Sequence, residues 1–100
     1  VNWDKYKELN TIGIDEISLR KGHASYVTVV SAKVTENSKP IVIGVLPDRE
    51  KVTVQTFLKS IPESLKQSVK QVCTDMYDGF VYAAIEVFGA QRLVIDRYHG

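Results

Sequence analysis

Three runs rich in valine and isoleucine fill much of the first half of the chain, and they predict β-strands. The runs cover residues 11–19, 26–34 and 41–46. Short polar connections separate them, and connections of that length join antiparallel neighbours, so we expect a meander. Asp15 and Glu16 interrupt the apolar pattern of the first run. Such a conflict with burial is expected where function has overridden packing.

The pattern changes to a helical period after Pro47. Apolar residues recur there at three- and four-residue spacing, which predicts a helix over residues 50–60 that packs on the sheet. These residues are Val54, Phe57, Leu58 and Ile61. Ser60 and Glu63 match the two ends of a capping box, with a proline in the first turn. A second short helix is therefore expected to begin there and to end near Ser68.

The last third of the chain predicts two strands separated by a helix. Residues 69–74 are expected to form a fourth strand and residues 92–96 a fifth. Between them, Asp78 is placed to cap a helix over residues 79–88, and Gly89 is placed to end it. The order of elements is therefore βββαβαβ, which indicates an α/β fold.

That order constrains the topology of the sheet. The fourth and fifth strands are linked by a helix, so they should be parallel, with a right-handed crossover. The long connection after the third strand lets the fourth lie beside the first, which predicts a mixed sheet in the order 3-2-1-4-5. Asp15 and Asp75 then fall on adjacent strands, about 5 Å apart, where their carboxylates could bind one divalent cation.

Composition is that of an ordinary globular chain. With 100 residues, 44% of them hydrophobic and 25% charged, the sequence corresponds to a single small domain or to part of one. There are 13 basic and 12 acidic residues, so the net charge is +1. This balance neither supports nor excludes binding to DNA.

Three further features concern location and processing. Cys73 lies in a valine-rich run and is expected to be a small buried hydrophobic residue rather than a catalytic thiol. No stretch has the length of a membrane span or the pattern of a signal peptide, so we expect a cytoplasmic protein. The chain begins at Val1 and its methionine is Met76, so we expect it to be a piece of a longer protein.

Four segments of the sequence together resemble a known family. In chain order they read IGIDEISLRKGHASYVTVV, VLPDRE, VCTDMYDGF and VIDRYH, within residues 11–99. They are similar to the catalytic core of bacterial insertion-sequence DDE transposases of the ISL-three type. That core has the ribonuclease-H-like fold shared with retroviral integrases. The resemblance implies that residues 1–100 form the N-terminal part of such a core, a single partial domain truncated after strand five.

The resemblance also implies a chemistry. Transposases cut a DNA phosphodiester and join the released 3′ hydroxyl to a target, and carboxylates hold the metal ions that assist both steps. The family's first and second acids correspond to Asp15 and Asp75, as catalytic residues and metal ligands. Asp15 is expected to bridge two Mg²⁺ ions and Asp75 to hold one, with Mn²⁺ as a substitute.

The remaining expectations concern what lies outside the chain. The resemblance implies a third acid, a glutamate on a helix beyond Gly100. A two-metal site is therefore expected only in the complete domain, and this chain alone should be inactive. The partners implied are DNA, as transposon ends and target, and further copies of the parent protein in a multimer. No membrane partner or small-molecule cofactor is implied.

Several other residues are secondary candidates, each with a simpler alternative. Asp96 could join the site or pair with Arg97, and His99 could bind metal or DNA or lie on the plain surface. Glu16 could bind metal, although strand alternation directs it to the face opposite Asp15, where a solvated or ion-paired role is the alternative. A last set could contact DNA phosphates or only form polar turns, namely Arg20, Lys21, His23 and Arg97.

Two rival interpretations remain open. A non-catalytic interaction or regulatory domain could have the same fold without the chemistry. A phosphorylation-receiver or nucleotide-binding module would also cluster acids at strand ends, but it requires an all-parallel sheet. The short connections among the first three strands argue against that module, and no glycine-rich phosphate loop is present in the sequence.

Overall fold

The computed structural model describes residues 2–18 and 26–95 of the chain. Five strands form one sheet: β1 (Thr11–Ser18), β2 (Tyr26–Lys33), β3 (Ile41–Leu46), β4 (Gln71–Thr74) and β5 (Leu93–Ile95). Three α-helices accompany it: α1 (Lys51–Ser60), α2 (Glu63–Ser68) and α3 (Asp78–Phe88). Two short 3₁₀ turns cover Trp3–Lys5 and Ala90–Arg92.

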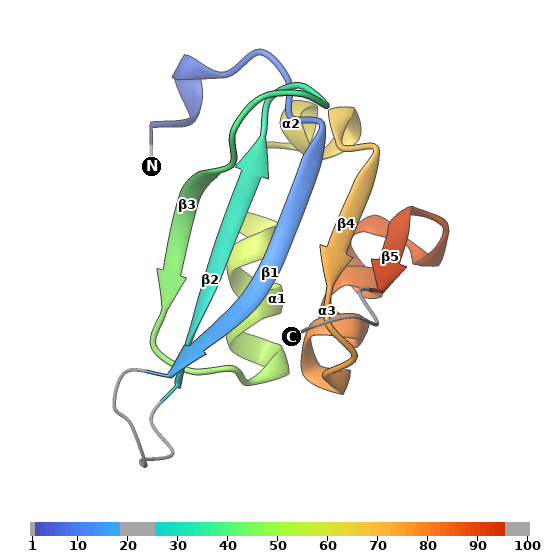
Figure 1. Ribbon diagram of the computed structural model, residues 1–100. Coiled ribbons are helices and arrows are strands. Elements are labelled where there is room, and N and C mark those ends of the chain that lie inside the picture. Colours follow the sequence, from blue (N-terminus) through green and yellow to red (C-terminus); the bar gives the residue numbers. More distant parts are fainter. Residues whose placement is uncertain (1, 19–25, 96–100) are drawn as a thin grey trace.

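The sheet has the strand order β3-β2-β1-β4-β5, as the sequence predicts (Figure 1). Strand β1 is antiparallel to β2 and parallel to β4, and β5 is parallel to β4. The chain therefore has the mixed sheet and the helical crossovers of a ribonuclease-H-like α/β fold. Because β1 and β4 run in the same direction, their carboxyl ends lie at the same edge of the sheet.

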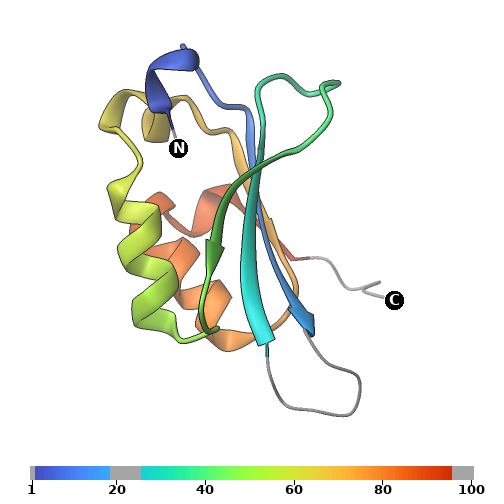
Figure 2. The same ribbon diagram turned by 90° about the vertical axis from the view of Figure 1, so that its left-hand side faces the viewer.

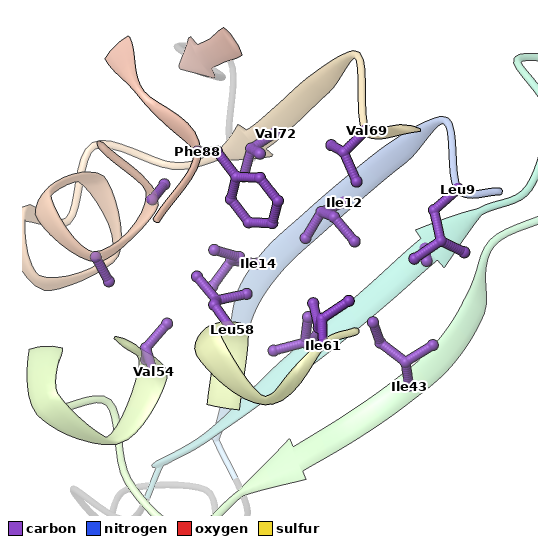
Figure 3. Packing of buried hydrophobic residues seen from close by; sticks show 14 of the residues in the cluster. Leu9, Ile12, Ile14, Ile43, Val54, Leu58, Ile61, Val69, Val72 and Phe88 are labelled. Carbon is purple, nitrogen blue, oxygen red and sulfur yellow. The ribbon is translucent and has the colours of Figure 1, made fainter. Parts of the chain in front are cut away.

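The helices α1 and α3 cover one face of the sheet, and this covered face holds the hydrophobic core (Figure 2). Alternation along β1 and β4 directs Ile12, Ile14 and Val72 to this face, and all three are buried. They pack with Val54 and Leu58 of α1, which are also buried (Figure 3). Burial of each large aliphatic side chain contributes roughly 1.5–3 kcal/mol, so this packing fixes the register of the central strands.

The opposite face, called the open face below, carries no helix within residues 2–18 and 26–95 (Figure 2). Directly paired residues of a sheet share a face, so the pairings identify its members. One row crosses all five strands: Val42, Ser31, Gly13, Cys73 and Val94. The next row contains Val45, Val29 and Asp15. Several apolar side chains of the open face are exposed, including Val42 at 60% and Val45 at 63%.

The capping predictions were wrong, although the helices themselves are present. Ser60 is the last residue of α1, and its Oγ donates to the carbonyl of Phe57 at 2.6 Å instead of capping α2. Asp78 is the first residue of α3 and not its cap. Among the described residues, no side chain caps the N-terminus of either helix.

The other boundaries agree more closely with the sequence. Strand β4 begins at Gln71 rather than at residue 69, because Val69 still ends α2 through a backbone hydrogen bond to Lys66. Gly89 ends α3 with φ of +90°, a conformation that favours glycine. None of the described helices combines the length and the apolar composition that crossing a membrane requires.

Candidate active site

Two aspartates line one shallow cavity at the point where the pairing of β1 with β4 ends. The last paired residues of these strands are Ile14 and Thr74, and Asp15 and Asp75 come directly after them. The cavity has a volume of about 210 Å³. Its lining consists of Gly13, Ile14, Asp15, Ser31, Cys73, Thr74 and Asp75. Two residues that are 60 positions apart in the sequence therefore share a site because their strands are neighbours.

Each aspartate accepts a hydrogen bond from a nearby backbone amide. The Asp15 Oδ1 accepts from the N–H of Glu16 at 2.8 Å, and the Asp75 Oδ1 accepts from the N–H of Tyr77 at 3.0 Å. A carboxylate has about four lone-pair positions, so one such bond orients the group without ending its capacity to bind a cation. The local backbone thus contributes to the orientation of both acids.

Gly13 forms the floor of this cavity together with its strand neighbours. A Cβ at Gly13 would lie 2.8 Å from the Oγ of Ser31, closer than such atoms normally approach. The absence of a side chain at Gly13 therefore avoids a clash with Ser31 in the lining of the cavity. Gly13 and Ser31 were not predicted as parts of the site, although a glycine inside a strand is a known signal of close approach.

Cys73 lies on the same floor, contrary to the expectation that it would be buried. Its side chain is partly exposed, because Cys73 pairs with Gly13 and shares the open face with it. The buried residues of β4 are its two neighbours, Val72 and Thr74. The prediction of a strand here was correct, but the expected burial of Cys73 was wrong.

The donor set fits a hard divalent cation in part. Two aspartate carboxylates supply oxygen ligands, and Mg²⁺ is commonly bound by one or two carboxylates together with water and substrate phosphates. Across residues 2–18 and 26–95, no group of three or more His, Cys, Asp or Glu side chains is placed to hold a metal ion. The pair would therefore form only part of a complete metal site.

Glu16 points away from the cavity and forms an ion pair, which is one of the two alternatives that the sequence left open. Its Oε2 lies 3.0 Å from Nη1 of Arg49. The hydrogen bond to Glu16, more than any other contact, raises the pKa of Arg49 above its ordinary value. Glu16 is not among the residues that line the cavity of Asp15 and Asp75.

The other candidates lie outside the described residues. Three of them come after Ile95 in the sequence, namely Asp96, Arg97 and His99. The other three come between Ser18 and Tyr26, namely Arg20, Lys21 and His23. The roles expected for all six residues remain predictions.

The strand order and the helices are those of a ribonuclease-H-like α/β fold. A sequence profile of the ISL3 transposase family, of the DDE type, matches residues 12–99, nearly the whole chain. The chain therefore belongs to this family of transposases, as its sequence segments indicated. No curated protein matches the chain. Membership of the family connects the fold to a transposase-type enzyme.

Proposed function

We propose that this chain carries two of the metal-binding acids of a DNA transposase, Asp15 and Asp75. The observation that carries the proposal is that both acids line one cavity, directly after the last residue pair of the parallel strands β1 and β4, in a chain of the transposase family. The parent protein would cut DNA at transposon ends and join the released 3′ hydroxyl to a target, in the bacterial cytoplasm. We expect that protein to act as a multimer.

The two acids of this chain would serve that reaction as ligands of metal ions. Asp15 and Asp75 would bind Mg²⁺, which when bound activates the attacking oxygen and stabilises the leaving one. The absence of a side chain at Gly13 leaves room beside the acids for a DNA phosphate. With two acids and no third in the cavity among the described residues, we expect the chain alone to bind metal weakly and not to transpose DNA.

Calorimetric titration of the chain with Mn²⁺ tests the metal site. We expect weak binding by the unmodified chain and its loss in both Asp15→Asn and Asp75→Asn, because each substitution replaces a negatively charged carboxylate ligand by a neutral amide. Asp4→Asn is the matched control, since Asp4 lies in the first 3₁₀ turn, away from the cavity. It should bind Mn²⁺ as the unmodified chain does.

A non-catalytic domain with the same fold predicts a different result. In that case Asp15→Asn and Asp75→Asn would match Asp4→Asn, with negligible heats throughout. A second measurement addresses the enzyme directly: Asp75→Asn in the complete transposase should abolish cleavage of transposon ends. Cleavage at the normal rate would show that Asp75 is not a catalytic acid.

A further inference from the structure

One arginine contacts three of the segments that surround the cavity. Arg49 lies in the connection between β3 and α1, and its Nη1 is 3.0 Å from the Oε2 of Glu16 on β1. Its Cζ lies 4.9 Å from the ring centroid of Tyr26, at the start of β2, and 5.0 Å from that of Tyr77, between β4 and α3. A single side chain therefore joins segments that are far apart in the sequence.

Two of these contacts reach the immediate neighbours of the candidate acids. Glu16, the ion-pair partner of Arg49, is the residue whose N–H donates to Asp15. Tyr77, whose ring lies against the guanidinium, is the residue whose N–H donates to Asp75. Arg49 is thus linked to each acid through one intervening residue.

The base from which Arg49 extends is itself anchored to the fold. The carbonyl of the preceding residue, Asp48, accepts a hydrogen bond from the buried Thr28 Oγ1 at 2.8 Å. The Oδ1 of Asp48 accepts a second bond, from the N–H of Glu50 at 2.9 Å. These bonds tie the connection to β2 and fix the start of α1. The position of the guanidinium is therefore set by the sheet as well as by its own contacts.

The segment of Tyr77 is anchored in a similar way. Its ring packs edge-on against Phe80, which is fully buried, with 4.9 Å between ring centroids. A Cβ at Gly79 would lie 2.7 Å from the Tyr77 ring and 3.2 Å from the carbonyl oxygen of Arg49. Glycine at position 79 thus allows the start of α3 to approach the Arg49 connection closely.

We propose that Arg49 is a positioning residue that holds the segments of Asp15 and Asp75 at the spacing at which both can bind one cation. The inference rests on the proposed metal-binding function. Half-exposed ion pairs contribute little to stability, and the Arg49 side chain is 42% exposed, so placement of the acids explains the cluster better than stabilisation does. A planar guanidinium can stack on an aromatic ring and donate to a carboxylate at the same time, which the ammonium group of lysine cannot.

The chain offers a matched control for this residue. Lys51 of α1 forms an ion pair with Glu86 of α3, and the two side chains are each 43% exposed. Lys51 resembles Arg49 in exposure, and the two pairs are similar in the separation of their partners along the chain. Glu16 is less exposed than Glu86, at 24%. Neither Lys51 nor Glu86 is a residue whose N–H donates to Asp15 or Asp75. Lys51→Ala therefore measures what the loss of a half-exposed ion pair does by itself.

The test compares Arg49→Ala, Arg49→Lys and Lys51→Ala in two measurements on the 100-residue chain. Amide resonances in metal-free ¹⁵N spectra report the hydrogen bonds from Glu16 and Tyr77 to the acids. Titration with Mn²⁺ reports affinity. We expect Arg49→Ala to shift both amides and to lower Mn²⁺ affinity about tenfold, as loss of residues that orient ligands does. Arg49→Lys should recover only part of that affinity, and Lys51→Ala should change neither quantity.

Thermal unfolding separates positioning from stability, because Arg49→Ala and Lys51→Ala should have similar melting temperatures. Equal amide shifts and equal Mn²⁺ affinities in these two variants would overturn the role of Arg49. Failure of the proposed function has a different signature, since Asp15→Asn and Asp75→Asn would then leave Mn²⁺ binding unchanged. Shifted amides in Arg49→Ala alone would support the positioning role even in that case, because they are measured without metal.

Discussion

The two faces of the sheet are built from alternate residues of the same strands, yet they differ in what they contribute. On β1, Ile12 and Ile14 are 0% and 3% exposed and pack beneath the helices. Gly13 and Asp15, between and after them, line the cavity of the open face. The covered face thus determines the register of the strands, and the open face holds the residues that this register brings together.

This difference explains how two acids can lie side by side although like charges repel. A slip of one residue would move every side chain of β1 to the other face and would place Asp15 in the core. Burial of an unpaired carboxylate is costly, so the apolar packing of Ile12 and Ile14 opposes that slip. The energy that places the acids therefore comes from residues on the face opposite to them.

The test with the largest expected effect removes a side chain of α3 from the core that lies against the covered face. Phe80 is fully buried, and Phe80→Ala should lower the free energy of unfolding by about 3–5 kcal/mol, since it loses both packing and a filled volume. Val45, 63% exposed on the open face, provides the contrast. Val45→Thr keeps the β-branched shape and should change stability by no more than about 0.5 kcal/mol. Urea unfolding measures both values.

A large loss in Val45→Thr would contradict the comparison, because it would mean that the open face is packed in solution. A change in the slope of the urea transition for Phe80→Ala would instead indicate an altered unfolded or native state. We expect the slope to stay unchanged in both variants, so that any change in stability appears only in the urea concentration at the midpoint.

A smaller test uses one glycine from each face. Gly44 is paired with Val30 on the covered face, and a Cβ there would lie 2.5 Å from the Phe57 ring of α1. Neither Gly44 nor Gly13 has positive φ, so alanine meets no backbone strain at either position. Gly44→Ala should cost about 2 kcal/mol, because a ring packed between sheet and helix must move.

Gly13→Ala should cost less, about 1 kcal/mol or below, because the Ser31 hydroxyl can rotate away. In a Ser31→Ala background the cost should disappear, since the contacting oxygen is gone. Equal costs at the two glycines in thermal or urea unfolding would contradict the difference between the faces.

The fold could be predicted from sequence because its signals are local and repeated. Runs of β-branched residues, the helical spacing from Val54 to Ile61 and the order of elements are sufficient for the strand order. The caps could not be predicted in the same way. Ser60 suits a helix start by type, but α1 extends to it and the chain becomes extended only at Ile61. That boundary depends on the packing of α1, which no four-residue motif contains.

The candidate site, too, could be predicted only in part. The pairing of Asp15 with Asp75 could be predicted because one lies in the first strand and the other directly follows the fourth, and the predicted strand order makes these strands neighbours. The contact between Glu16 and Arg49 could not, because 33 residues separate them and a charged residue has many available partners. Side-chain partners at long range depend on the assembled fold rather than on any pattern in the sequence.

A third test concerns two buried threonines on the covered face. Thr28 and Thr74 are 0% and 2% exposed. The Thr28 Oγ1 donates to the carbonyl of Asp48, whereas the Thr74 Oγ1 has no hydrogen-bond partner among the residues that the structure describes. A buried hydroxyl without a partner loses its bond to water and gains none in return. Thr74→Val should therefore stabilise the fold by about 1 kcal/mol.

Thr28→Val is its matched control and should have the opposite sign. It would leave the Asp48 carbonyl without its donor and should destabilise the fold by about 1 kcal/mol. Urea unfolding of the two variants at one pH measures the difference. If Thr74→Val lowered stability as Thr28→Val does, the Thr74 hydroxyl would have a hydrogen-bond partner in solution. Thr74, directly before Asp75, would then make a polar contact on the covered face. If the two signs differ, the Thr28 hydroxyl stabilises the fold through its hydrogen bond, whereas the Thr74 hydroxyl, next to Asp75, contributes none.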